Sequence, residues 1–354
     1  MLFVKVDDLK VGMRLARPIY NKNGVMLYER NTNLTTQGIV SIKNFGLIGI
    51  YILEPAEPLP PMSEEDKAFE RFQTIGMFSI KDDLVLLTKG QKNKNLISLT
   101  NMLVRDYGNL NHRINFMQNL RSLDDYVYKH SLNAAILVAL LSHCHGLKGQ
   151  AQVDVITAAL LHDIGSVLHP ITSIHSDDAE EEAAVRRKYQ NEGLDLIKRD
   201  PTISPNVIQI LTQYFRSGAS SRMIEAQILA IASRYDALTA MSLESEPVSG
   251  FCALQRMMEK KDVYNPSLIQ NLLNCIQILP PGACVELSNH EKGLVITENP
   301  MDILKPTILS FRDNSIYDLS IKSVSDSVQI VDIMKTMDNR FVIDEEALAQ
   351  FHSK

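Results

Sequence analysis

The sequence predicts an α+β protein in which a predominantly all-α core lies between a small N-terminal α+β module and a short β-rich C-terminal tail. Three observations predict this fold class. Strand-like runs separated by turns fill residues 1–54, apolar residues at helical spacing recur through residues 121–275, and strand-like runs return after Pro280-Pro281-Gly282. Residues 55–120 join the module to the core, so we expect four segments: 1–54, 55–120, 121–275 and 276–354.

The N-terminal module is predicted from apolar runs at residues 2–6, 13–19, 25–28 and 48–53, with a turn at Asn21-Lys22-Asn23-Gly24 and a helix over residues 35–45. Four prolines between residues 54 and 61 remove backbone donors and fix φ, which is typical of a linker. Ser63 and the acidic run Glu64-Glu65-Asp66 then have the cap and first turn of a helix. We expect a connector helix that continues, with breaks, to about residue 120.

The core is predicted as a series of apolar helices. Over residues 126–145 a stripe of apolar side chains at helical spacing includes His130, which places this histidine on the buried face. The next helix is apolar nearly all round as far as His162 and Asp163, as a central helix should be. Ser204 and Pro205 start another helix at its cap and first position, and residues 223–241 form the last clear one. Strand-like runs follow at residues 284–287, 293–297 and 307–311.

The composition indicates a soluble globular protein. The chain has 354 residues, of which 45% are apolar. Its formal net charge of −6 does not favour binding to the negatively charged backbone of a nucleic acid polymer. No apolar run approaches the roughly 20 residues that span a bilayer, and the first residues lack the layout of a signal peptide. We therefore expect a cytoplasmic protein with no membrane partner. The cysteines, Cys144, Cys252, Cys275 and Cys284, include no CxxC pair and are expected to be reduced and mostly packed.

The pair His162-Asp163 is the strongest chemical signal in the chain. Neutral imidazole binds transition metals and a carboxylate adds a negatively charged oxygen, so the pair can hold iron, manganese, zinc or a similar divalent ion that activates water. This chemistry is hydrolytic and is typically directed at phosphate esters. The alternative is a buried polar network without an ion, in which His130 hydrogen-bonds to Asp163, because unsatisfied buried polar groups cost about 1–3 kcal/mol.

The order of three segments is similar to that of a known family. His130 is followed by His162-Asp163-Ile164-Gly165 and later by Ala232-Ser233-Arg234-Tyr235-Asp236-Ala237-Leu238-Thr239. This order resembles the HD-GYP branch of the HD metal-dependent phosphohydrolases, and the likeness extends to residues 4–13 and 279–288. The resemblance implies an HD-domain helical core whose active members bind two or three metals and hydrolyse the bacterial messenger cyclic-di-GMP. It also implies that His130, His162 and Asp163 are metal ligands, and that His162 and Asp163 are catalytic if the protein is active.

Two segments depart from the family pattern. Tyr189 stands four residues before Gly193, where the family has a histidine, and a phenol with a pKa near 10 is a poor substitute. Gln213-Tyr214-Phe215 replaces a histidine pair and a glutamate, and the Gly-Tyr-Pro loop is missing between Ser217 and Met223. The resemblance therefore implies the loss of ligands and of the substrate loop.

Three further positions matter for the metal site. Ser233 replaces an aspartate ligand and Ser166 replaces a lysine, while Asp236 matches a second family aspartate for which we expect a mainly structural role. His169 and His175, in the loop after the motif, could compensate for a lost ligand. Since a two-metal clamp stabilises both the attacking and the leaving oxygen, loss of the second ion should remove several kcal/mol of transition-state stabilisation.

These observations predict a bacterial signalling protein with a degenerate HD-GYP-like domain, non-catalytic or weakly active, that acts by binding a protein partner or a cyclic dinucleotide. The partner could be a diguanylate cyclase or a receiver-type protein, and a homodimer stays open. The alternative is a metal-dependent cyclic-di-GMP phosphodiesterase with a reduced metal site that holds one ion at most. A third alternative is a cyclic-dinucleotide sensor, whose phosphate contacts could come from Arg186, Arg187, Lys188, Arg199 and Arg216.

Overall fold

The computed structural model describes residues 2–21, 25–53, 63–169, 179–216, 223–242 and 246–333, with backbone only for residues 179–183. Residues 22–24 of the predicted turn, the proline-rich linker, His175 and the position of the missing Gly-Tyr-Pro loop lie outside these ranges. The chain divides into two compact units. A helical unit comprises Met62–Ala240 and Met257–Ile276, and the other unit draws on Met1–Pro61, Met241–Arg256 and Gln277–Lys354.

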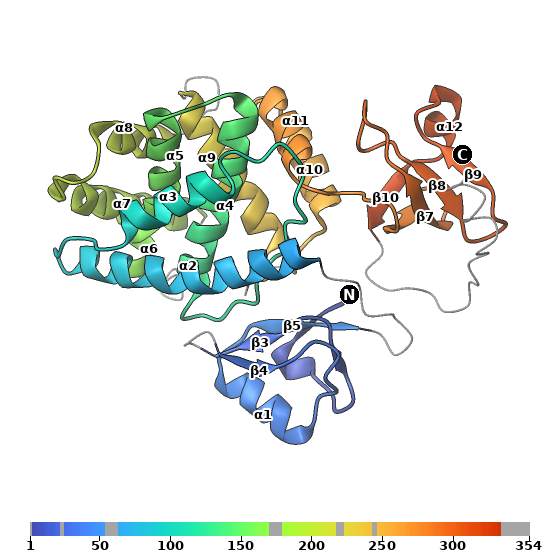
Figure 1. The fold of residues 1–354 in the computed structure, drawn as a ribbon, viewed down its shortest axis with the longest axis horizontal. Helices are drawn as coiled ribbons and strands as arrows, with labels where there is room; N and C mark the ends of the chain where they lie inside the picture. Colours follow the sequence, from blue (N-terminus) through green and yellow to red (C-terminus); the bar gives the residue numbers. More distant parts are fainter. Residues whose placement is uncertain are drawn as a thin grey trace. The chain divides into compact units, whose positions relative to one another are not determined.

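The helical unit is a bundle of α-helices (Figure 1). Its helices are α2 (Glu64–Thr88), α3 (Leu96–Asp106), α4 (Tyr126–His145), α5 (Gln150–Leu161), α6 (Ile164–Leu168), α7 (Ala179–Arg199), α8 (Pro205–Tyr214), α9 (Ile224–Thr239) and α11 (Pro266–Cys275). Helix α10 (Gly250–Met258) begins in the segment Met241–Arg256, which groups with the other unit.

Helix α4 is the central helix of this bundle. It packs against α2, α5, α9 and α11, and every residue from His130 to Ser142 is buried. Gly146, at φ 90°, ends the helix in the left-handed conformation that glycine adopts without strain. The predicted helix over residues 126–145 is therefore present with the same ends, and Ser204 and Pro205 begin α8 as cap and first residue.

The segment predicted as a connector packs within the bundle. Helix α2 begins at a capping box between Ser63 and Asp66 and contacts α4, and α3 contacts α5. The apolar stripe of α2, which includes Phe69, Ile80 and Leu84, is buried. The compact helical unit consequently starts at residue 62, whereas the sequence placed the start of the core at residue 121.

The N-terminal module contains a three-stranded antiparallel sheet in the order β1-β5-β2 and a separate β3-β4 hairpin. Its elements are β1 (Leu2–Lys5), the 3-10 turn η1 (Val6–Asp8), β2 (Arg14–Leu15), β3 (Ile19–Tyr20), β4 (Met26–Tyr28), α1 (Thr36–Asn44) and β5 (Gly49–Leu53). The single strand predicted over residues 13–19 was wrong, because it splits into β2 and β3 in different sheets. Pro18 lies between them and has no N–H to donate to a strand ladder.

The C-terminal segment forms a five-stranded antiparallel sheet in the order β10-β6-β7-β8-β9. Its elements are β6 (Cys284–Leu287), β7 (Lys292–Thr297), β8 (Thr307–Ser310), β9 (Ile316–Asp318), α12 (Lys322–Ser327) and β10 (Ile330–Ile333). Leu294, Ile296 and Leu309 form a small apolar cluster of its own. A helical core with a small β-containing module and C-terminal strands confirms the predicted fold class.

Residues Gln150–Leu168, which are α5 and α6 together, are long and apolar enough to cross a membrane, although the sequence was expected to hold no such stretch. Packing inside the helical unit explains the apolar character of this segment. In the helical unit 61% of the most apolar window is buried, as expected for a core helix of a soluble protein. Helix α5 contacts α3, α4, α8 and α9.

Candidate metal centre

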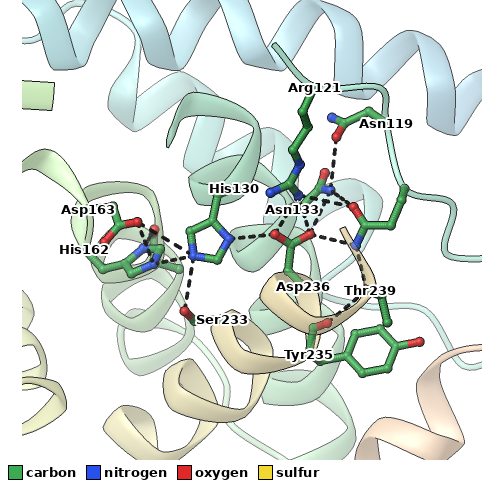
Figure 2. Close-up of polar contacts among 12 residues, drawn as sticks. Asn119, Arg121, His130, Asn133, His162, Asp163, Ser233, Tyr235, Asp236 and Thr239 are labelled. Carbon is green, nitrogen blue, oxygen red and sulfur yellow. Dashed lines mark hydrogen bonds and ion pairs between the residues drawn. The ribbon is translucent and has the colours of Figure 1, made fainter. Parts of the chain in front are cut away.

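Three side chains from α4 and from the break after α5 converge at one point (Figure 2). Helix α5 ends at Leu161 and α6 begins at Ile164, so His162 and Asp163 occupy the break between them. The Nε2 atoms of His130 and His162 lie 3.2 Å apart, and Asp163 Oδ2 lies 3.8 Å and 4.0 Å from them. The structure thus brings together the three residues that the sequence predicted as metal ligands.

Hydrogen bonds fix which nitrogen of each ring is free. His162 Nδ1 lies 2.6 Å from the carbonyl oxygen of Ala159, which can only accept, so Nδ1 carries the hydrogen and Nε2 keeps its lone pair. His130 Nδ1 lies 2.6 Å from Asp236 Oδ2 and donates to that carboxylate in the same way. Both free lone pairs therefore point at the same small space.

The spacing of these lone pairs fits a metal ion. Two facing lone pairs repel unless a cation or a proton lies between them. Metal–nitrogen bonds of about 2.0–2.1 Å place two ligand nitrogens roughly 2.9–3.4 Å apart for octahedral to tetrahedral angles, and the observed 3.2 Å falls in this range. Burial lowers the pKa of His162, which keeps the imidazole in its neutral, metal-binding form. The Asp163 side chain is 27% exposed, so water can reach the open side of the site.

Asp236 orients His130 from behind. It is fully buried, and Arg121 Nη2 donates to both of its oxygens at 2.8 Å and 2.6 Å. Gln118 and Asn133 donate to Oδ1 at 2.9 Å and 3.0 Å. Burial opposes ionisation, but the charge of Arg121 and the hydrogen bond from His130 hold the pKa of Asp236 far below its usual value. His130 therefore donates its hydrogen bond to Asp236, whereas the metal-free alternative had assigned Asp163 as its partner.

A chain of hydroxyl groups borders the site. Ser233 Oγ lies 3.2 Å from His130 Nε2, and the Tyr214 hydroxyl donates to Ser233 Oγ at 3.1 Å. The Tyr214 ring also packs edge-on against His162, with ring centroids 5.6 Å apart. Two of the positions that depart from the family pattern thus contact the histidines through neutral groups.

His169 lies outside the cluster of three donors. Its Nε2 is 2.5 Å from Glu192 Oε2, and its ring stacks on Tyr189 with centroids 4.0 Å apart. Within the described ranges, His130, His162 and Asp163 form the one group of three or more potential metal ligands. The structure gives His169 other partners, and compensation by His175 stays a prediction because that residue is not described.

Sequence reasoning missed the polar network around Asp236. Gln118 and Arg121 come from the non-helical segment before α4, where no periodicity marks them as buried. Asn133 lies three residues after His130 on the same helix, so its spacing could have indicated that both face the same partner.

The model of the HD domain family matches residues 127–238, the stretch that carries His130, His162-Asp163 and Asp236. The chain therefore carries an HD domain in this stretch. It is also similar to a cyclic di-GMP phosphodiesterase of Pseudomonas aeruginosa, with 24% identity over 204 residues, 54% of this chain and 49% of that protein. The match spans about half the length of this relative. Together the two findings support an HD-GYP-like HD domain.

Proposed function

We propose that this HD-GYP-like protein binds one divalent metal ion through His130, His162 and Asp163, and that it acts in cyclic-di-GMP signalling by binding a partner or the nucleotide, with little or no turnover. The observation that carries the proposal is the pair of Nε2 atoms 3.2 Å apart, with their lone pairs facing each other beside the Asp163 carboxylate. The relative supplies the link to cyclic-di-GMP.

The donor count supports binding rather than rapid hydrolysis. Three protein ligands and water suffice for one ion, whereas a two-metal site needs further donors to clamp the attacking and leaving oxygens. Among the described residues beside the cluster, Ser233 and Tyr214 offer neutral hydroxyls, which bind a divalent ion less well than a carboxylate or an imidazole. The protein partner we propose is a signalling protein such as a diguanylate cyclase or a receiver-type protein.

The first test is metal content by mass spectrometry on protein purified without oxygen. We expect about one ion per chain in the wild type and almost none in His162→Ala. His169→Ala is the matched control, because His169 is a histidine of the same unit that lies outside the cluster, and it should keep its ion. Near two ions per chain would contradict the reduced site, and no ion in the wild type would leave the three residues as a polar network.

A slow single-metal phosphodiesterase is the second candidate function. The solvent access at Asp163 favours it, because a bound ion there would keep open positions for water and a phosphate oxygen. When bound, the ion would lower the pKa of its water and polarise the phosphate. Cyclic-di-GMP turnover that is abolished in Asp163→Ala would support this candidate. Binding of the partner or of cyclic-di-GMP that survives Asp163→Ala, with no turnover in the wild type, would support the binding function.

A further inference from the structure

Helix α2 holds the non-helical segment before α4, residues 111–122, against one of its faces. Phe69 and Gln73 are four residues apart on α2, so they lie on the same face of that helix. The Phe69 ring packs edge-on against Phe116, with ring centroids 5.7 Å apart, and Gln73 Nε2 donates to the carbonyl oxygen of Met117 at 3.0 Å. The segment is therefore fixed to α2 in its middle.

The buried amide of Gln73 also reaches α4. Gln73 is only 4% exposed, and its Nε2 donates to Asn133 Oδ1 at 3.0 Å in addition to the Met117 carbonyl. An amide nitrogen of this kind carries two hydrogens, and the two bonds use both of them. One side chain of α2 thus ties the segment 111–122 and α4 together.

Both partners of Gln73 lead to Asp236. Asn133 Nδ2 donates to Asp236 Oδ1 at 3.0 Å (Figure 2). Gln118, the residue after the bonded carbonyl group in the segment, donates to the same oxygen at 2.9 Å. Because Asp236 accepts from His130 Nδ1, two short routes of buried groups connect α2 with an imidazole of the candidate metal centre.

The direction of these hydrogen bonds is fixed. Asn133 donates from Nδ2 to Asp236 and to Gln118 Oε1, at 3.0 Å and 3.1 Å, so its Oδ1 is the atom that faces Gln73. If Gln73 moved away, Asn133 Oδ1 would lose this donor. A turn of the Asn133 amide toward a new donor would break its bonds to Asp236 and Gln118, so a change at Gln73 is passed on to the carboxylate.

We propose that Gln73 is a positioning residue of the candidate metal centre, and that through it the placement of α2 sets how tightly the site holds its ion. The effect on affinity rests on the proposed function, in which the ion binds at His130, His162 and Asp163. A displacement of α2 withdraws the donors of Gln73, Asp236 shifts, and His130 Nε2 no longer faces its partner donors. Since α2 follows the N-terminal module along the chain, a signal that displaces α2 changes the affinity for the metal.

The first measurement is calorimetric titration of the metal-free full chain with Zn²⁺, in the wild type and in Gln73→Leu, which removes the donors at similar volume. We expect binding to be roughly 2–30-fold weaker in this variant. Gln152→Leu is the matched control, because Gln152 is also 4% exposed and also donates to a backbone carbonyl, that of Gly108 at 2.8 Å, and to a side-chain oxygen, Ser142 Oγ at 3.3 Å. It should keep the wild-type affinity.

The second measurement is the proton resonance of His130 Nδ1–H, recorded by NMR on metal-free protein with isotope-labelled histidine. A hydrogen bond of 2.6 Å to a buried carboxylate moves this resonance downfield, and the resonance reports on the bond whether or not a metal binds. We expect it to shift in Gln73→Leu and to stay in place in Gln152→Leu.

An unmoved resonance together with wild-type Zn²⁺ affinity in folded Gln73→Leu would overturn the proposal, as would an equal loss of affinity in Gln152→Leu. Gln73→Asn, which keeps the amide but withdraws it by one methylene, is the milder second variant and should show smaller changes in the same direction. No Zn²⁺ binding in the wild type would overturn the proposed function and with it the effect on affinity. A shifted resonance in Gln73→Leu would then still support the positioning of His130 by Gln73.

Discussion

At the residue scale, the fully buried pair of Asp236 and Arg121 determines how His130 presents Nε2 to the candidate metal centre. Asp236→Asn removes the negative charge and leaves Arg121 buried without its counter-ion, which should lower the free energy of unfolding by about 3–5 kcal/mol. Loss of the carboxylate behind a histidine ligand should also weaken metal binding by about 10–100-fold. Urea denaturation and metal titration by calorimetry measure the two effects.

Asp154→Asn is the matched control for this change. Asp154 is also a buried aspartate of the helical unit, but its partners are the neutral side chains of Gln150 and Asn206. We expect a smaller loss of stability and an unchanged metal affinity. If Asp236→Asn binds metal as tightly as the wild type, Asp236 is a core residue without a positioning role.

Tyr107 should make the protein sensitive to alkaline pH. Burial, with smaller contributions from the charges of Asp106 and Glu65, raises the pKa of this phenol above its usual value of about 10. Its contribution to stability is complete below pH 10 and is lost as the pH rises toward the folded-state pKa, because only the unfolded chain then releases the proton. The loss is at most about 1.4 kcal/mol per pH unit for this group.

The corresponding variant is Tyr107→Phe, which keeps the edge-on packing against Phe69 and Phe72. Chemical denaturation at a series of pH values above 10 should show a shallower decline in the variant than in the wild type. Identical declines would mean that the phenol ionises equally well in the folded protein.

At the scale of elements, two glycines allow α6 to lie against α7 and so hold the break that carries His162 and Asp163. A Cβ on Gly165 would overlap the carbonyl oxygen of Tyr189, and one on Gly193 would lie 2.8 Å from the Gly165 nitrogen. Gly165→Ala should therefore push the two helices apart and cost about 1–3 kcal/mol of unfolding free energy. Because Asp163 is two residues away, bound metal should decrease as well.

Ser166→Ala, the adjacent position, serves as the control and should change stability by no more than about 0.5 kcal/mol. Chemical denaturation and metal content are measured on both variants. Equal stability of the two would show that α6 shifts to accept the methyl group without loss.

Elements with strong local signals could be predicted from the sequence, and those set by long-range packing could not. Helix α4 was predicted with both ends from the apolar residues that recur at helical spacing over residues 126–145. The end of the apolar helix at His162 and Asp163 was predicted, but α6 was not, because the residues after the motif were assigned to a loop and the packing of Gly165 on α7 is a long-range contact. Similarly, the motif and the family resemblance indicated the three candidate ligands, whereas the polar network at Arg121 arises from a segment without periodicity.

At the scale of the whole molecule, the candidate metal centre lies entirely in the helical unit. His130, His162, Asp163 and the supporting Asp236 all belong to Met62–Ala240. The composition shift at the prolines and the return of strand-like runs near residue 280 marked the segments outside this unit. Residues 63–120 could not be assigned to the helical unit from the sequence, because an apolar stripe occurs on any amphipathic helix and does not show what the helix packs against.

Because the site lies in the helical unit, metal binding should increase the free energy of unfolding of that unit alone. At a free metal concentration about 100 times Kd, binding to the folded state should add about 2.7 kcal/mol, which corresponds to a rise in Tm of about 5–10 °C for a unit of this size. The other unit should unfold at an unchanged temperature. Because the chain has no tryptophan, differential scanning calorimetry is the suitable measurement. Asp163→Ala should abolish the rise, and a rise of equal size in that variant would mean that the ion binds elsewhere in the protein.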